Sequence, residues 1–186
     1  MTGTESCSRT PLVSSFASAL LIPAGSADTS RQKTSLQEIA DRLGLTKPAL
    51  YYHFGSREAL VRSIVQPLID AGQEFLERQE QAPELEAEAL LEGFFDFHYE
   101  YRADVLLVLT EMTTLADLGL IDVVLEWRAR LTRLLFGPEP TVAQATRAVM
   151  ALGGMQDCTM QFPDVPREEL RTATVEAAMA TLGLAR

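Results

Sequence analysis

Between residues 46 and 57 the chain concentrates side chains that donate hydrogen bonds or carry positive charge, together with one proline. They are Thr46, Lys47, Pro48, Tyr51, Tyr52, His53 and Arg57. When a helix enters the major groove of duplex DNA, its first turn meets the base edges. Hydroxyl, imidazole and guanidinium groups further along can reach the phosphates. The spacing therefore suits a helix that binds double-stranded DNA, with residues 46–48 in its first turn.

The neighbouring residues predict the elements that hold this helix in place. Ser35 to Glu38 form a capping box, in which the serine hydroxyl can accept a hydrogen bond from the Glu38 N–H. Apolar residues then follow at helical spacing: Leu36, Ile39, Ala40 and Leu43. Gly44 can supply the positive φ of a tight helix end, and Thr46 can cap the next helix. This pattern predicts a helix-turn-helix, and disfavours a hairpin whose tyrosines only cover a core.

The stretch LTKPALYYHFGSREAL resembles the end of the DNA-binding domain of TetR-type transcriptional repressors. The resemblance implies that Tyr51 and Arg57 contact the DNA backbone. It also implies that the residues from Lys47 to Ala49 face bases and that Tyr52 and His53 lie near the DNA. Ser35 completes our set of candidate DNA contacts. The clear resemblance covers about 35 of the 186 residues, and beyond it only the all-helical pattern agrees.

Composition predicts an all-α protein of two parts. Hydrophobic residues make up 47% of the chain and strand signals are scarce. Residues 1–66 hold seven basic and five acidic groups, whereas residues 67–186 hold nine basic and 21 acidic groups. This asymmetry would direct the first part towards DNA and keep the second away from it. We therefore expect a helix-turn-helix domain over 1–66, disordered at 1–10, and a helical ligand-binding and dimerisation domain over 67–186.

The small numbers of cysteines and histidines limit the other kinds of site that the chain can form. The cysteines, Cys7 and Cys158, form no disulfide framework, which fits a reducing cytosol and a cytoplasmic protein. The histidines, His53 and His98, are too few for a zinc cluster, and we expect no metal and no cofactor. No apolar run is long enough to span a membrane.

The N-terminal segment allows two interpretations. Within residues 11–22, pairs of apolar residues recur every four positions, as they do on one face of a helix. The alternative is a secretory signal peptide, with Arg9 before the apolar stretch and residues 24–27 as a cleavage site. Three interrupting serines favour the first helix of the DNA-binding domain. Residues 23–33 form a longer loop than the family's usual short turn, which leaves the position of that helix open.

The pattern after residue 55 predicts a series of helices. The first runs from Ser56 to about Gln81, with four residues inward: Leu60, Ile64, Leu68 and Phe75. Pro67 should kink it near 63–67, and both a switching role and a merely tolerated kink remain open. The next, within 84–102, carries an acidic stripe that we interpret as a solvated face: Glu88, Glu92, Asp96 and Glu100.

Glycines and caps delimit the later helices. Gly119 and Gly137 are typical helix C-caps, and a capping box from Thr141 to Gln144 opens a helix to about Phe162. A last helix covers about 166–182. Both final helices are rich in small residues, and the resemblance implies that they form a dimer interface. We nominate Ala148, Leu152 and Ala177 as its contacts.

These observations together predict a ligand-responsive transcriptional regulator. We expect a repressor that binds a palindromic operator as a homodimer and is released by a small apolar or aromatic effector. Candidate effector contacts, chosen by helical phase and by the resemblance, are Phe94, His98, Tyr101, Met112, Trp127 and Gln156. The alternative at these positions is a solid core.

Two other classes of function remain as alternatives. A small helical enzyme could use Cys158 as nucleophile with His98 as base, or Glu111 as a buried acid, but nothing in the sequence fixes their geometry. A DNA-binding architectural protein without a ligand is the other alternative. It does not require the long helical body.

Overall fold

The computed structural model describes residues 46, 48, 52, 54–102, 104, 105 and 116–184. Within this part of the chain there are five helices and no strand: α4 (Arg57–Glu80), α5 (Ala87–Glu100), α8 (Leu120–Phe136), α9 (Val142–Gln161) and α10 (Arg167–Leu182). The all-α prediction is confirmed. No helix among these residues is both long enough and apolar enough to cross a membrane. The expected helix over 11–22, the loop over 23–33 and most of the helix-turn-helix lie outside the described residues.

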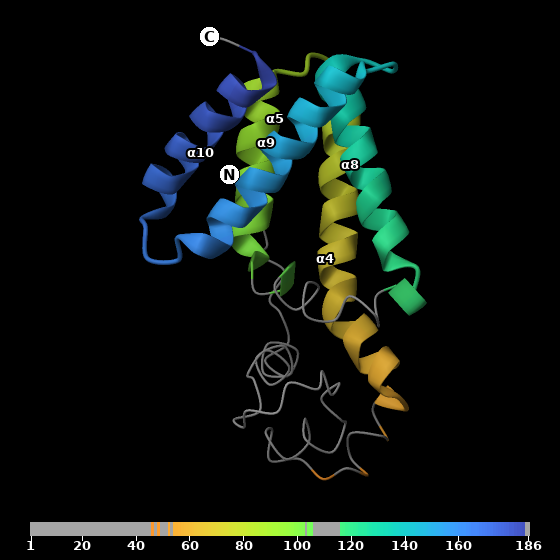
Figure 1. Ribbon diagram of the computed structural model, residues 1–186. Helices are drawn as coiled ribbons and strands as arrows, with labels where there is room; N and C mark the ends of the chain where they lie inside the picture. Colours follow the sequence, from red (N-terminus) through yellow and green to blue (C-terminus); the bar gives the residue numbers. More distant parts are fainter. Residues whose placement is uncertain are drawn as a thin grey trace, which may run out of the picture.

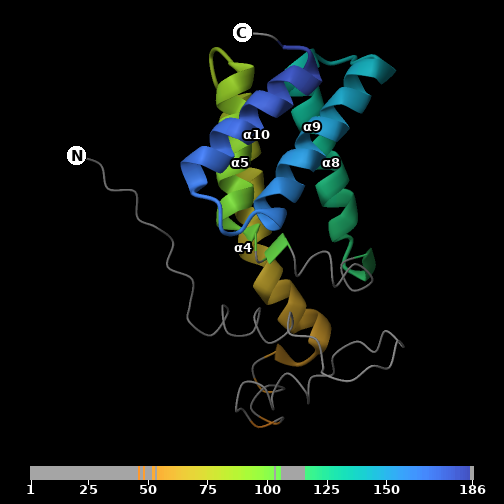
Figure 2. The ribbon, with the colours of Figure 1, turned by 60° about the vertical axis from the view of Figure 1, so that its left-hand side comes forward.

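The helices form two neighbouring groups. Helices α4 and α8 run side by side, while α5, α9 and α10 pack together beside them (Figure 1). Contacts of α5 with α4 and of α9 with α8 join the two groups. The start of α4 and the end of α10 lie at opposite ends of the molecule in both views (Figure 2).

Helix α4 begins where the sequence predicts. The Ser56 hydroxyl accepts a hydrogen bond from the Ala59 N–H at 3.1 Å, which caps the first turn. Leu60, Leu68 and Phe75 are buried as expected; the side chain of Ile64 lies outside the described residues.

Pro67 stands inside α4 and deprives the Ser63 carbonyl of its usual N–H partner. The Ser63 hydroxyl also donates to the Leu60 carbonyl at 2.8 Å, a bond that favours bending of a helix. Both views show the orange N-terminal part of α4 inclined to the remainder (Figures 1 and 2). The predicted bend is therefore present, and it has two local causes.

The hydrophobic core lies chiefly among α5, α9 and α10. Its most deeply buried members include Leu90, Leu91, Phe95, Ala148, Leu152, Met155, Ala178 and Leu182. Burial of each large side chain contributes about 1.5–3 kcal/mol. This cluster fixes the position of α5, and therefore of the opposite face of α5, which is turned towards α4.

The acidic stripe of α5 is not simply a solvated face, and our interpretation of it is corrected. Helix α10 lies alongside, and the Arg171 Nη2 is 3.1 Å from a Glu92 carboxylate oxygen. The Arg167 Nη2 is 2.9 Å from the Asp96 Oδ1. The position of α10 against α5 brings these partners together, which helical phase within α5 alone could not reveal.

The ends of the later helices follow the predicted signals. Gly137, at φ 88°, ends α8, and its N–H donates to the Arg133 carbonyl at 2.8 Å. Gly119, at φ 70°, closes a turn immediately before α8. Thr141 and Gln144 form the reciprocal capping box at the start of α9. These local signals therefore place α8 and α9 correctly along the chain.

Candidate functional site

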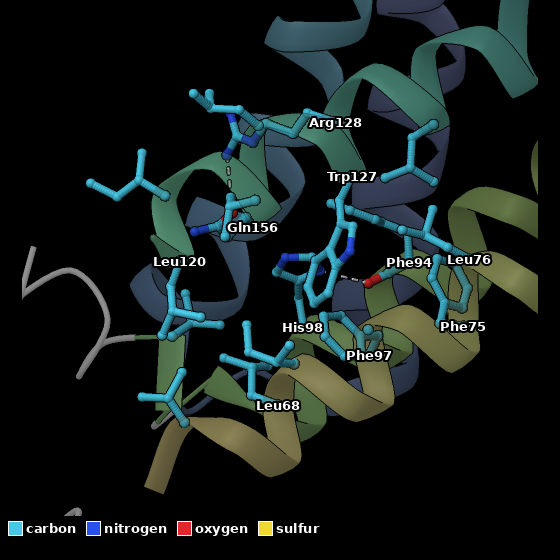
Figure 3. Close-up of a pocket in the computed structure, with 18 residues that line it drawn as sticks. Leu68, Phe75, Leu76, Phe94, Phe97, His98, Leu120, Trp127, Arg128 and Gln156 are labelled. Atoms are coloured by element: carbon cyan, nitrogen blue, oxygen red, sulfur yellow. Dashed lines mark hydrogen bonds between the residues drawn. The ribbon is translucent and has the colours of Figure 1, made fainter. Parts of the chain in front are cut away.

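A cavity of about 270 Å³ lies between α4, α5 and α8 and reaches α9 (Figure 3). Fifteen of the side chains or backbone segments around it are apolar: Val65, Leu68, Ile69, Gly72, Phe75, Leu76, Phe94, Phe97, Val105, Leu120, Ile121, Val124, Leu125, Trp127 and Leu131. Among the described residues, the three polar ones that line it are His98, Arg128 and Gln156. An apolar wall with a few polar groups is the usual composition of a small-molecule site.

Helical spacing explains how each element contributes to the wall. On α5, Phe94, Phe97 and His98 recur three and four residues apart, so they share one face of the helix. On α8 the lining residues Val124, Trp127 and Leu131 follow the same rule. The cavity therefore lies where the apolar faces of these helices meet the face of α4 without filling the space between them.

Four of the six nominated effector contacts line this cavity: Phe94, His98, Trp127 and Gln156. Tyr101 does not line it, because Tyr101 follows the end of α5, where its ring lies 5.2 Å from that of Phe97. Met112 lies outside the described residues. The sequence did not lead us to predict that α4 supplies part of the wall or that Arg128 lines the cavity. That Val65, Leu68 and Ile69 share one face could have been found from helical phase.

The Trp127 indole forms part of the wall and packs against Gly72 of α4. A Cβ atom at residue 72 would overlap the six-membered ring of the indole. Glycine is therefore required here by close approach, and not by an unusual backbone conformation. The contact connects the cavity directly to the backbone of α4.

His98 is buried, and its Nδ1 lies 3.0 Å from the Phe94 carbonyl oxygen. Burial lowers the pKa of His98 to about 4; the hydrogen bond to Phe94 opposes this shift, and the nearby charge of Arg128 adds to it. The imidazole is therefore neutral at pH 7. Since a carbonyl can only accept, Nδ1 carries the proton and Nε2 is a hydrogen-bond acceptor. The ring is held by Phe94 and Phe97, at centroid distances of 4.1 Å and 5.0 Å.

Arg128 and Gln156 form the second polar group of the cavity. The Arg128 Nη2 donates to the Gln156 Oε1 at 3.2 Å, across from α8 to α9 (Figure 3). Because guanidinium groups only donate, this bond fixes the orientation of the glutamine amide. The Gln156 NH₂ group therefore remains as a further donor at the same place.

Few of the candidate DNA contacts fall within the described residues. Thr46 and Pro48 are exposed, and Tyr52 is 87% exposed. Arg57 begins α4, but its side chain is not described. Ser35, Lys47, Tyr51 and His53 lie outside the described residues. Their roles on DNA therefore remain predictions.

Two of the three nominated dimer contacts require correction. Ala148 and Leu152 are 0% and 1% exposed within a single chain, so neither side chain is available to a second chain. The physical reason is helical phase, because this face of α9 packs on α5 and α10. Ala177 is exposed. The outer face of α9 instead presents Val149 and Met150, which are 57% and 65% exposed.

The groups considered for an enzyme do not assemble in the described part of the chain. The hydrogen bond of His98 is to Phe94 and not to Cys158, which is partly buried against the core. Glu111 lies outside the described residues. No group of three or more potential metal ligands occurs among the residues that the structure describes.

Residues 31–64 match the family model described as bacterial regulatory proteins, tetR family. The match contains every candidate DNA contact from Ser35 to Arg57, and it ends within α4, before Pro67. No curated protein matches the chain significantly. The described cavity thus begins on α4 at Val65, directly after the matched segment.

Proposed function

We propose that this chain, a DNA-binding transcriptional regulator of the tetR family by the match over residues 31–64, is a repressor that a small effector releases from its operator. The observation that carries this proposal is the apolar cavity, because it is bordered by α4, the helix in which the family match ends. A DNA-binding protein without a ligand would not need such a cavity. We further propose a division into residues 1–66, which bind DNA, and residues 67–186, which sense and dimerise.

Helix α4 is the element through which the two parts communicate in this proposal. It supplies six lining residues, including Gly72, against which Trp127 packs. An effector that enters the cavity must therefore contact α4 or residues packed on it. The effector must prefer one position of α4 energetically, and a 100-fold loss of operator affinity requires about 2.7 kcal/mol of such preference.

On DNA we propose that Lys47 reads bases while Tyr51 and Arg57 hold phosphates. A single helix-turn-helix makes few base contacts, so specific binding favours two copies on a palindromic site. Val149 and Met150 of α9, together with the exposed Ala177 of α10, are the proposed dimer contacts. Val149 and Met150 replace Ala148 and Leu152 in our assignment, and Ala177 is kept.

The experiment is a screen for induction. An operator selected from random duplexes by the purified protein is labelled, and apolar and aromatic compounds are tested for release of the protein by fluorescence anisotropy. Trp127→Ala and Phe94→Trp should each shift the half-effective concentration of any inducer by tenfold or more, because they change the cavity wall. Phe162→Ala, at the exposed end of α9, serves as the control. An inducer whose response is unchanged in both cavity variants would place sensing elsewhere.

A further inference from the structure

We propose that the effector is an apolar carboxylic acid, bound as its anion with the carboxylate at Arg128 and Gln156; this assignment deepens, and rests on, the proposed effector function. The apolar body of the acid would lie among Phe94, Trp127 and the facing residues of α4.

The hydrogen-bonding groups of Arg128 and Gln156 favour a ligand with a negative charge. Arg128 can only donate, and its bond to the Gln156 oxygen leaves the glutamine NH₂ group as a donor also. The Arg128 guanidinium and the Gln156 NH₂ group therefore both present donors to a ligand that reaches them. A carboxylate satisfies such a pair, since guanidinium and carboxylate groups match in a planar two-point geometry.

The charged residues around the cavity also favour a carboxylate ligand. Among the eighteen lining residues that the structure describes, none is acidic, and Arg128 supplies the single formal charge. Among the described ion pairs, the arginines Arg130, Arg133, Arg167 and Arg171 each have a carboxylate partner, whereas Arg128 takes part in none. Arg128 is partly buried, so a carboxylate in the cavity would interact with it under weaker solvent screening than on the surface.

His98 determines which end of the ligand approaches it. Its Nε2 is an acceptor in the neutral tautomer described above, so it repels a carboxylate and favours a hydroxyl or N–H donor. The carboxylate is therefore directed to Arg128, and a hydroxyl group on the apolar body would be directed to His98. Figure 3 shows the imidazole beside Trp127, and it shows Gln156 and Arg128 joined to each other by their hydrogen bond.

The volume limits the size of the acid. An engineered apolar cavity of about 150 Å³ holds benzene, so a cavity of about 270 Å³ suits roughly eleven non-hydrogen atoms. This corresponds to one aromatic ring with a short carboxylate chain.

The test uses ω-phenylalkanoates from phenylacetate to 5-phenylpentanoate, each compared with the alcohol and the amine of the same length. The chain has one tryptophan, Trp127, in the cavity wall, so its fluorescence reports binding directly. We expect at least one carboxylate to bind tenfold or more tightly than its alcohol, and the amine to bind most weakly. A para-hydroxyl group should strengthen binding of that carboxylate several-fold.

Variants identify the group responsible. Arg128→Gln should abolish the preference for carboxylate over alcohol, and Arg128→Lys should retain part of it. Arg133→Gln is the matched control, since Arg133 lies on the same helix but does not line the cavity and pairs with Glu126. Both preference and affinity should be unchanged in this control.

Two results would overturn the assignment. Alcohols that bind as tightly as carboxylates in the parent protein would show an apolar site without charge selection, and the proposed effector function would stand. A series in which no member binds would also reject the acid as ligand class. Whether the protein has any effector is then decided by the independent release screen on operator DNA.

Discussion

The indole of Trp127 lies so close to the backbone of α4 that Gly72 has no room for a Cβ atom. One wall of the cavity is thus in direct contact, without an intervening side chain, with the helix in which the segment matched by the family model ends. Displacement of the indole and displacement of α4 are therefore coupled by packing.

This contact predicts the effect of Gly72→Ala. In a helix, alanine normally stabilises relative to glycine by about 0.5–1 kcal/mol. Here overpacking against Trp127 should reverse the sign and cost about 1–3 kcal/mol in the free energy of urea unfolding. Gly154→Ala in α9, where a Cβ meets nothing within 4 Å, should stabilise and serves as control. If Gly72→Ala cost as much in a Trp127→Ala background, the indole would not be the obstacle.

The buried imidazole predicts a pH dependence of stability. The pKa of His98 is lowered to about 4, whereas an unfolded histidine titrates near 6.5. Between these values the unfolded chain binds a proton that the folded chain does not, so stability falls as the pH is lowered through this window. At pH 4.5 the loss from this group is about 2.5 kcal/mol. Arg128 of α8, the charged residue that lines the cavity with it in the described part of the chain, adds to the effect and does not offset it.

The measurement compares urea unfolding at pH 7 and pH 4.5 for the parent and His98→Gln. Carboxylates titrate in both proteins, so the difference between their pH dependences isolates residue 98. Equal losses in the two proteins would mean that the imidazole is not held neutral.

The ion pair between Arg130 and Glu80 predicts a contrast between two arginines of α8. The Arg130 Nε and Nη2 each donate to a Glu80 carboxylate oxygen at 2.7 Å, which joins α8 to the end of α4. This bond lowers the pKa of Glu80. Arg130→Met should cost about 1 kcal/mol, because the pair is partly exposed. Arg133→Met, which loses a more exposed pair within α8, should be close to neutral by thermal unfolding. A reversed order would contradict the proposed importance of the interhelical pair.

The proposed dimer predicts that a substitution on the exposed face of α9 can lower operator affinity without changing the fold. Met150→Arg on the exposed face of α9 should leave the helical content and melting temperature of the monomer intact, because the side chain is not part of the core. It should shift sedimentation towards the monomer and lower operator affinity at least tenfold. Glu139→Arg, in the exposed turn before α9, is the control for added charge. A monomeric variant with full operator affinity would exclude the dimer as the binding species.

The proposed DNA contacts predict that substitutions of Lys47 and Arg57 affect DNA binding in different ways. Lys47→Ala should relax sequence preference and cost about 1–3 kcal/mol on the selected operator. Arg57→Ala should weaken all duplexes similarly and lower the salt slope of binding by about one. Titrations at several salt concentrations on operator and random duplexes distinguish the two. Identical profiles for both variants would contradict the assigned roles.

Local signals in the sequence were sufficient to place the helix ends. Ser56, the pair of Thr141 and Gln144, and Gly137 act through their own backbone neighbourhood, so their effects can be read without knowledge of the tertiary fold. Helical phase likewise identified Phe94 and His98 as members of one face.

Features that depend on the neighbouring helix could not be predicted in the same way. The acidic Glu92 meets Arg171 only because α10 lies beside α5. Ala148 has the small size of an interface residue, but α10 covers its side of α9 within one chain. Arg128 adjoins Trp127 in the sequence, yet its place at the cavity depends on Gln156 from α9.

The bend at Pro67 gives α4 the geometry of a lever. Ten residues separate Arg57 from Pro67, and at about 1.5 Å per residue this arm is about 15 Å long. A tilt of about 10° at the proline then displaces the tip by about 2.6 Å, close to the length of a hydrogen bond. In a symmetric pair the two tips move in opposite senses, so their spacing changes by up to about 5 Å against a DNA repeat of about 34 Å. In the proposed dimer, a movement at the cavity too small to disturb the core would therefore change the spacing of the two recognition helices relative to the groove.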